Sequence, residues 1–450
     1  SVYSNFNYTY QSKYNLSGSY RVDRTNLFGA DPKYINRPLW SAGLGWNASE
    51  EDFLKNISWI NFLKLRATYG VNGNVDQGSS PYLTATRRND NLIPTLQFTN
   101  VTALPNPKLR WEKVATTNFG LDYSIFKGKL RGTLDIYRKY STDLLASTEL
   151  DPTVGALSRV INSGAMLNKG IEFTVGSDWY NQGDLRLSSN FIIAFNRNQI
   201  KKITSSNATA PSYVGAPSNN FVLNDSYNTL YAYRYGGMVN GYPYVLDENG
   251  NPSILFDADG NPIPSSIKSG INNLAALVNM GTLLPVYTGS FSQRISYKQF
   301  DLNMLFIFSG GNKLRKDFVD PANGKTAAIT STVTTNGQQN NLPRIWVDYP
   351  EITNVLNNAG NILTLWRNSD ANVADADYVK LRNVSLSYNL PKSFADKIKI
   401  SSAKLTFQMN NIWYWSAAGN GIDPETFSLN SGTRNLPLPK TYLFGFNLTL

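Results

Sequence analysis

The sequence predicts an all-β protein, specifically a transmembrane antiparallel β-barrel, and three observations support this prediction. Long segments alternate apolar and polar residues, as between residues 113 and 140, which places the two kinds on opposite faces of a strand. The alternation lasts about a dozen residues, longer than the five or six of most globular strands and enough for the roughly 9–11 that cross a bilayer. Short and long connections also alternate along the chain, which is typical of outer-membrane barrels.

The hairpin at 106–145 shows the alternation most clearly. Phe119 and Leu121 are apolar, and residues on the alternate positions around them, such as Asn118 and Asp122, are polar. Gly128 supplies the positive φ that the tight turn between the two arms requires. The hairpin therefore has one apolar face and one polar face.

Similar segments recur from the first residue to the last, and about 13 strands are expected. The expected strands are 2–10, 14–24, 39–48, 62–71, 113–125, 130–140, 170–179, 185–195, 284–297, 300–308, 378–390, 403–414 and 440–450. In YVKLRNVSLSY the apolar positions change from odd to even numbers near Arg382–Asn383. One extra residue would produce this change, so we expect a β-bulge there.

The connections divide into a short set and a long set. Short ones lie near 11, 50–58, 127, 182, 298 and 391–399, and long ones cover 25–37, 72–111, 143–167, 198–283, 311–376 and 416–439. This division predicts short periplasmic turns, long extracellular loops and a periplasmic C-terminus. Tryptophans near strand ends would face lipid in the interfacial belts, namely Trp40, Trp46, Trp179, Trp413 and Trp415. Core packing in a soluble β-sandwich is the alternative for them.

Composition excludes several classes of function. The 450 residues include no Cys and no His, which excludes thiol nucleophiles, disulfides, imidazole bases and His-ligated metals. The net charge is +10, but the Lys and Arg residues lie singly along strands and turns. We therefore expect a polar lumen or lipid headgroups, and no nucleic acid, to face them. No apolar run approaches 18 residues, so no transmembrane helix is expected.

Acidic motifs are weak candidates for chemistry. DENGNP at 247–252 and DADGNP at 257–262 resemble half of a calcium loop, but neither has the closing Glu. Their Asn-Gly and Asp-Gly dipeptides favour hairpin turns. The pairs Glu50–Glu51 and Asp375–Asp377 lack an accompanying catalytic motif, and the first lies at the start of a short turn-side helix. No catalytic residue, cofactor or metal site is assigned, and the protein is not expected to be an enzyme.

Two segments of the long connections are rich in aromatic residues and Asn. They are NDSYNTLYAYRYGG at 224–237 and GQQNNLPRIW at 337–346. Aromatic faces beside amides could bind a sugar or a peptide, but the loops of any large barrel contain many such residues. Two alternatives stay open: these segments contact a ligand, or they have the ordinary composition of large barrel loops. The substrate-binding residues are unknown.

Many segments, in order along the whole chain, resemble one family, the SusC/RagA-like TonB-linked outer-membrane transporters. The matching segments are FLKLRATYGVNGN (62–74), NPKLRWEK (106–113), NFGLDYSIFKGKLRGTLDIYRKYSTDLL (118–145), NSGAMLNKGIEFTV (162–175), TGSFSQRISYKQFDLNMLFIFSGG (288–311), ADYVKLRNVSLSYNLP (376–391), NNIWYWSAAGNGIDPET (410–426) and LPKTYLFGFNLTL (438–450). The resemblance implies a barrel of about 22 strands with a plugged lumen. Residues 1–450 would then be the C-terminal part of the barrel.

The resemblance also implies a role and partners. The role is import of a nutrient, an oligosaccharide or a peptide, across the outer membrane of a Gram-negative bacterium. A SusD-like surface lipoprotein would rest on the long loops, and TonB would act through a plug that lies upstream of this chain. Alternatively, the barrel is a structural scaffold subunit of a larger outer-membrane assembly. Because sheet edges are costly in lipid, upstream sequence or another chain should supply the remaining strands. The final residue is Leu450, where such barrels usually end in Phe.

Overall fold

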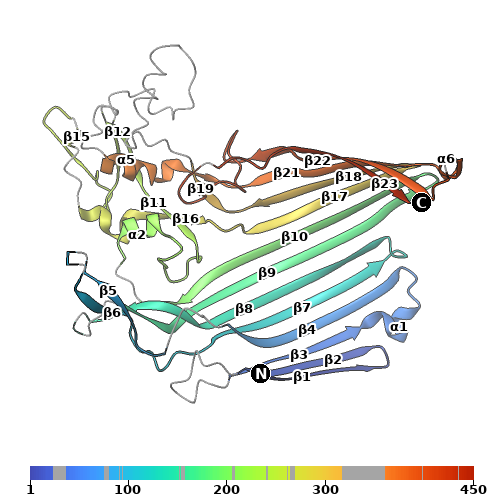
Figure 1. Cartoon of the computed structure of the whole chain (residues 1–450), viewed down its shortest axis with the longest axis horizontal. Coiled ribbons are helices and arrows are strands. Elements are labelled where there is room, and N and C mark those ends of the chain that lie inside the picture. Colours follow the sequence, from blue (N-terminus) through green and yellow to red (C-terminus); the bar gives the residue numbers. More distant parts are fainter. Residues whose placement is uncertain are drawn as a thin grey trace, which may run out of the picture.

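Thirteen strands form one antiparallel sheet in the computed structural model (Figure 1). The structure describes residues 1–450 except 24–36, 75–80, 91, 94, 152, 154–157, 205–207, 240–241, 261, 264–268, 317–359, 398, 434 and 450. The strands of the large sheet are β1 (Val2–Tyr10), β2 (Tyr14–Asp23), β3 (Arg37–Asn47), β4 (Ile60–Asn74), β7 (Glu112–Ile125), β8 (Leu130–Glu149), β9 (Ser158–Gln182), β10 (Leu185–Lys202), β17 (Tyr287–Tyr297), β18 (Phe300–Gly310), β21 (Tyr378–Asn389), β22 (Ser402–Ser416) and β23 (Thr441–Thr449). The predicted all-β class and number of strands are confirmed.

The order of strands in the sheet follows their order in the chain. It runs β1-β2-β3-β4-β7-β8-β9-β10-β17-β18-β21-β22-β23, so each strand pairs with the strands before and after it. Within the described residues the sheet is open, because β1 and β23 each pair on one side only. We call this sheet the wall.

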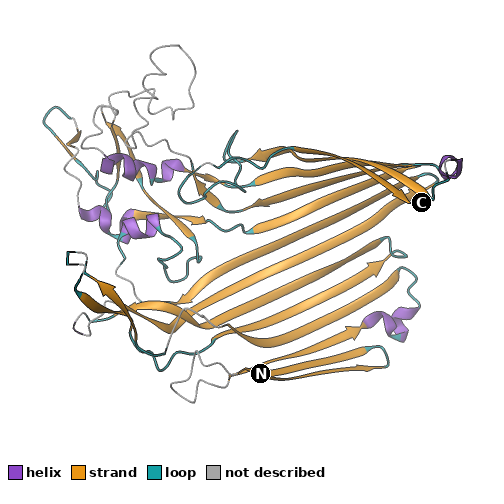
Figure 2. Cartoon of the chain, viewed as in Figure 1, coloured by secondary structure: helices purple, strands orange, loops and turns teal. Residues whose placement is uncertain are grey.

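Two ends of the wall differ sharply (Figure 2). At the short-turn end, chain reversals take only a few residues, or carry the helices α1 (Asp52–Lys55) and α6 (Lys392–Lys397). The C-terminus lies at this end, on the right of Figure 1. At the other end, the connections carry small elements that lie outside the large sheet. They are β5 (Thr84–Asn89), β6 (Gln97–Ala103), α2 (Ala210–Gly215), β11 (Thr229–Tyr233), β12 (Tyr235–Val239), β13 (Tyr242–Val245), β14 (Leu255–Phe256), β15 (Pro262–Ile263), β16 (Leu277–Thr282), β19 (Lys313–Arg315), α5 (Gly360–Arg367) and β20 (Val373–Asp375).

Tight reversals at the short-turn end use left-handed backbone. Phe126, Lys127 and Gly128 have φ values of 54°, 58° and 78°, and together they turn β7 into β8. The predicted turn at Gly128 is therefore present.

None of the described helices is long and apolar enough to cross a membrane.

The β-bulge predicted near Arg382–Asn383 is confirmed. On β18, Leu305 pairs with Asn383 and the next residue, Phe306, pairs with Leu381. Arg382 is therefore the extra residue, and the pairing of β21 with β22 shifts at the same place. The bulge restores one apolar face along the whole strand.

One predicted long connection, at 143–167, is wrong. β8 and β9 stay paired until Glu149 meets Ser158, so most of this range is strand. The register shifts twice between Thr142 and Leu145, and Asp143 has φ 59°. This irregularity interrupts the alternation, so the apolar–polar pattern ends here although the strand continues. The expected connection at 25–37 lies almost entirely outside the described residues.

Every described strand of the wall contributes to one continuous apolar face. Leu44 on β3 pairs with Ala67 on β4, Ala67 pairs with Phe119 on β7, and Phe119 pairs with Ile136 on β8. Directly paired residues point to the same side of a sheet. These side chains are largely exposed: Leu44 at 63% and Phe119 at 60%. The two buried apolar clusters found among the described residues lie instead in the connections.

Candidate functional site

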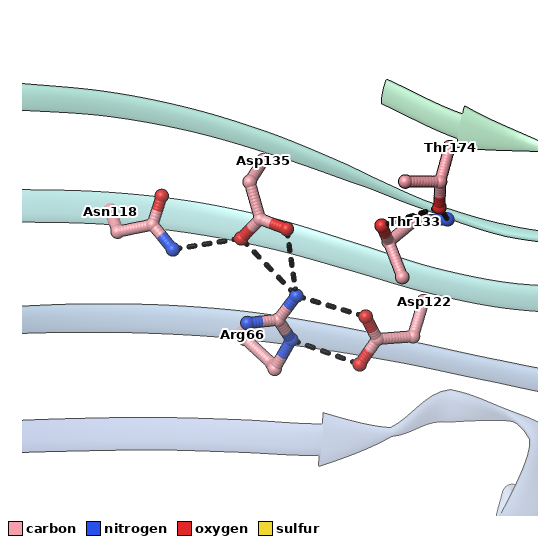
Figure 3. Close-up of polar contacts among 6 residues, drawn as sticks. All are labelled: Arg66, Asn118, Asp122, Thr133, Asp135 and Thr174. Carbon is pink, nitrogen blue, oxygen red and sulfur yellow. Dashed lines mark hydrogen bonds and ion pairs between the residues drawn. The ribbon is translucent and has the colours of Figure 1, made fainter. Parts of the chain in front are cut away.

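A cluster of charged residues lies on the polar face of the wall (Figure 3). Arg66 on β4 donates from Nε to Asp122 Oδ2 and from Nη2 to Asp122 Oδ1, both at 2.9 Å. Its Nη2 also lies 3.1 Å from Asp135 Oδ2 on β8. Asn118 on β7 donates to Asp135 Oδ1 at 2.8 Å. One guanidinium thus links three strands in addition to their backbone hydrogen bonds.

Gly120 explains how Arg66 can reach across β7. In the sheet Gly120 pairs with Arg66 on one side and with Asp135 on the other. A Cβ at Gly120 would lie 2.6 Å from Arg66 Cζ and 2.8 Å from Asp135 Oδ1. The missing side chain leaves the space in which the guanidinium meets both carboxylates.

A polar hollow of about 710 Å³ continues from this cluster towards the short-turn end. Its lining includes Asp122, Arg131, Thr133, Thr174 and Asn190. The Thr133 and Thr174 hydroxyls are 2.8 Å apart across the β8–β9 pair. Hydroxyl, amide and charged groups on one face, with the apolar row on the other, make a wall that can separate water from hydrocarbon.

The connections at the opposite end pack into a second body, which we call the loop layer. It comprises α2, β11–β16, β19, β20, α5 and the segment 417–433. Its core contains Ala210, Tyr213, Val214, Tyr231, Tyr233, Val245, Ile271, Leu277 and Leu365. Burial raises the pKa of Tyr233 to about 12. The loop layer therefore has an apolar interior like that of a globular domain.

This core includes rings from the segment 224–237, one of the two segments considered above for ligand contact. Residues Thr229–Tyr233 form β11 and are all buried. The rings of Tyr231 and Tyr233 pack inside the loop layer and cannot stack on a ligand. Tyr227 is 38% exposed but stacks on Phe221 at 5.2 Å between ring centroids. The other candidate, 337–346, lies outside the described residues.

Arg315 on β19 joins three parts of the loop layer. It is 1% exposed. Its Nε donates to the carbonyl oxygen of Asn430 at 3.0 Å, and its Nη2 donates to that of Tyr231 at 3.1 Å. Its backbone N–H also donates to Leu429 O at 2.8 Å. Burial lowers the pKa of Arg315 to about 10, so it stays charged at neutral pH.

A buried ion-pair cluster, the loop clamp, fastens segment 417–433 to the wall. Lys380 Nζ on β21 lies 2.5 Å from Asp423 Oδ1 and 2.6 Å from Glu425 Oε2. The Lys380 and Asp423 side chains are each only 6% exposed. Arg382, the bulged residue, also pairs with Glu425 and donates to Asn411 Oδ1 at 3.0 Å. The sequence gives no local signal for this clamp, because Glu425 lies 45 positions from Lys380 and 43 from Arg382.

The two acidic motifs, at 247–252 and 257–262, form turns. Asp247 Oδ1 accepts from the backbone N–H groups of Asn249 and Asn251, both at 2.9 Å. Asp257 Oδ1 accepts from Asp259 N at 3.0 Å, and its motif connects β14 to β15. Both motifs therefore form the predicted tight turns. Across the described part of the chain, no group of three His, Cys, Asp or Glu side chains could hold a metal ion.

In both predicted carboxylate pairs, acidic side chains are engaged by partners of their own. Glu51 accepts hydrogen bonds from Tyr14 Oη at 2.6 Å, Lys13 Nζ at 2.9 Å and Trp46 Nε1 at 3.1 Å. These hydrogen bonds lower the pKa of Glu51 to about 2. Asp375 pairs with Lys313, and Asp377 accepts from Gly311 N at 2.7 Å. The expected turn-side helix is present as α1.

The predicted tryptophans lie near both ends of the wall. Trp40, Trp179, Trp413 and Trp415 are 41–54% exposed. Trp46 lies on the apolar face beside Leu65, and its indole N–H turns to Glu51. This distribution matches an aromatic belt at each interface of a bilayer.

Comparisons with known proteins agree with this architecture. The family model described as "TonB dependent receptor-like, beta-barrel" matches residues 1–412. TonB-dependent receptor P3 of Formosa agariphila is 27% identical, over 100% of this chain and 45% of its own length. TonB-dependent receptor SusC of Bacteroides thetaiotaomicron is 26% identical, over 100% of this chain and 43% of its own length. The chain thus spans about half the length of the curated relatives it matches.

Solved structures share the fold. The RagAB peptide transporter structure aligns with a TM-score of 0.74 and 23% identity, covering 100% of this chain and 47% of that chain. The RagAB peptide importer in its open-open state aligns with the same TM-score and 21% identity. The predicted resemblance to SusC/RagA-like proteins is confirmed. Since the family model covers most of the sequence, this chain belongs to the TonB-dependent receptor-like β-barrel family.

Proposed function

We propose that the full-length protein imports a large nutrient, an oligosaccharide or a peptide, across the outer membrane, and that this chain forms part of its barrel wall. One observation carries the proposal: the wall has a continuous apolar face and an opposite face with the Arg66 cluster and the polar hollow. Such a wall lets a water-filled passage cross hydrocarbon. The RagAB peptide transporter, whose fold this chain shares, supports the peptide class. The oligosaccharide class is proposed from the resemblance of the sequence to the SusC/RagA-like transporters.

The residues on the polar face of the wall would bind and guide a solute without reacting with it. The Arg66 cluster pairs one guanidinium with two carboxylates, so it presents hydrogen-bonding groups and an excess of one negative charge to a passing solute. The ion pairs also brace β4, β7 and β8 against each other. We place the C-terminus in the periplasm, because it lies at the short-turn end. The remaining strands and the plug through which TonB would act are placed outside this chain.

We place a SusD-like lipoprotein over the long connections, where the β5–β6 hairpin offers a docking point. A hairpin of two strands is marginal by itself, yet this one exposes Leu92 at 92% and Ile93 at 55%. Asp90 Oδ1 accepts from the N–H groups of both residues, at 2.7 and 3.0 Å, and so holds the turn that displays them. Exposed apolar side chains whose backbone is held by Asp90 suit a protein partner.

Uptake by cells with the full-length gene tests the proposal. Labelled oligosaccharide and labelled peptide should each be compared in wild-type cells, a gene deletion and a strain without TonB. Uptake of one label that is lost in both mutant strains is the expected result. Normal barrel assembly with no TonB-dependent uptake of either label would instead favour the scaffold role.

Copurification tests the docking point separately. Leu92→Asp with Ile93→Asp should weaken recovery of a lipoprotein partner, because two charges would be placed in an apolar contact. Leu223→Asp is the matched control, since Leu223 is 50% exposed in the loop layer. Equal loss of the partner in both variants would show that the hairpin is not its docking point.

A further inference from the structure

A groove of about 620 Å³ lies on the apolar face of the wall, across β1 to β8. Its lining includes Tyr8, Leu16, Leu44, Ala67 and Phe119. We infer that this groove binds one zwitterionic phospholipid of the leaflet at the short-turn end, with an acyl chain in the groove and the headgroup beside Lys13 and Glu51. The groove volume is within the roughly 300–1,000 Å³ of small-ligand sites.

The groove exists because a small residue lies between large ones. Ala67 pairs with Leu44 on one side and with Phe119 on the other, so its methyl group forms a low floor. Tyr8 and Ile136 lie farther out on either side of this row. The depression is therefore built by the pairing register of the sheet and has apolar walls and floor.

The groove is polar at one end only. Tyr14 and Trp46 line it where β2 and β3 approach the short-turn end. Both donate to Glu51, and Lys13 Nζ lies 2.9 Å from the same carboxylate. Aromatic rings with one polar tip are typical of the membrane interface, so this end marks the depth of the headgroups.

Charge selects the kind of headgroup. Lys13 and Glu51 place one positive and one negative group side by side, with side chains 18% and 14% exposed. A phosphate beside the ammonium of Lys13 and an amine beside the carboxylate of Glu51 would complement both. An anionic headgroup would meet Glu51 unfavourably, because like charges repel. The pair therefore fits a zwitterionic lipid such as phosphatidylethanolamine.

The groove is separate from the proposed solute passage. The side chain of Arg66 and its carboxylate partners lie on the other face of the same strands, since adjacent residues on a strand point to opposite sides. Hydrocarbon borders the apolar face of a membrane barrel. A lipid acyl chain is therefore the ligand that surrounds this groove, and the polar end would make it bind one kind of lipid in preference to others.

Filling the groove tests the inference in the full-length protein. Ala67→Trp should occupy the floor while keeping the face apolar, so that the barrel still inserts. Ala42→Trp is the matched control, because Ala42 lies on the same face of β3 one row away and does not line the groove. Native mass spectrometry in mild detergent should find one phospholipid on wild type and on Ala42→Trp. Ala67→Trp should retain at least about tenfold less, a loss of about 1.4 kcal/mol in binding.

A second arm tests the headgroup. Phosphatidylethanolamine, phosphatidylglycerol and lipid A are added separately to the delipidated full-length protein. Wild type should bind phosphatidylethanolamine best, and Lys13→Met should remove that preference while leaving Ala67 and the groove intact. No lipid on wild type, equal loss in Ala67→Trp and Ala42→Trp, or a preference for lipid A would each overturn the inference. None of these outcomes bears on whether the protein imports a nutrient.

Discussion

The wall and the loop layer differ in where they place their large apolar side chains: the wall exposes them and the loop layer buries them. In the wall, Phe119 is 60% and Phe444 84% exposed, whereas in the loop layer Leu230 is fully buried and Tyr233 is 2% exposed. The wall turns its largest apolar side chains outward because hydrocarbon is its surroundings. The loop layer turns them inward because water surrounds it. The difference shows that one polypeptide is adapted to two environments, hydrocarbon around the wall and water around the loop layer.

Stability has different sources in the two regions. Each wall strand is hydrogen-bonded along its length to its neighbours, and in lipid those bonds are obligatory. The loop layer has short strands and depends on its buried core and on Arg315 and the loop clamp. Substitutions in one region should therefore leave the other largely intact.

The largest effect is expected from Tyr233→Ala in the loop-layer core. Removing a buried aromatic side chain costs about 3–5 kcal/mol. Hydrogen exchange should show loss of protection in β11 and β16, with β7–β10 unchanged. Tyr227→Ala, at a partly exposed ring, is the control and should change little. Equal loss of protection in the wall would show that the two regions fold as one unit.

Lys380→Met should open the loop clamp. It leaves the buried carboxylate of Asp423 without its cation, which costs about 3 kcal/mol, the lower end for a broken buried pair, because Arg382 keeps Glu425. Limited proteolysis should then cut segment 417–433 faster. Adding Asp423→Leu should recover part of the protection. If the double variant is cut faster still, the pair is not the clamp.

Gly120→Ala should weaken the wall modestly. The new Cβ would meet Arg66 and Asp135, and moving these flexible groups apart should cost about 1 kcal/mol, at the low end for overpacking. Urea unfolding in detergent, followed by heat-modifiable gel migration, measures the change. At Gly18 the nearest atom would be 3.8 Å from a Cβ, so Gly18→Ala is the control. Equal effects at both sites would argue against the Arg66 cluster as the cause.

The smallest effect is expected at Glu51, which is at the wall's short-turn end. Its pKa is about 2, below its ordinary value of 4.5. The carboxylate therefore stabilises the turn above about pH 4.5, and that contribution is lost as the pH falls towards 2. The protection factors of the amides in 48–59, corrected for the intrinsic exchange rate at each pH, should fall over this range in wild type. Glu51→Gln should exchange faster at neutral pH and lose the acid-dependent change, and an unchanged acid response would contradict this role.

The wall was largely predictable because its rules are local. Alternation identified the strands, and consecutive strands pair, as the hairpin at Gly128 shows. Even the bulge at Arg382 is visible as a change from odd to even apolar positions. The prediction was wrong at 143–167, where Asp143 and a double register shift hide a continuing strand pair. A period-two pattern cannot reveal a strand that loses its own period.

The loop layer was not predictable in the same way. The rings of 229–233 were candidates for ligand contact, and the structure uses them as core. The partners of Lys380 and Arg315 come from segments far away in the chain, and no short pattern specifies those encounters. Glu51 was visible as an acidic residue near a helix, but not as the acceptor for Tyr14, Lys13 and Trp46.

The amino-acid order by itself determined where the 13 strands of the wall lie and which face of each is apolar, because side-chain alternation is a property of neighbouring residues. It did not determine how far β8 and β9 extend, nor the short strands of the connections. Only the tertiary structure decided that Arg66 meets two carboxylates over a glycine, that a lysine locks a distant loop to the wall, and that a groove opens over Ala67. Each of these depends on the register between strands and on contacts between remote segments, which local sequence does not encode.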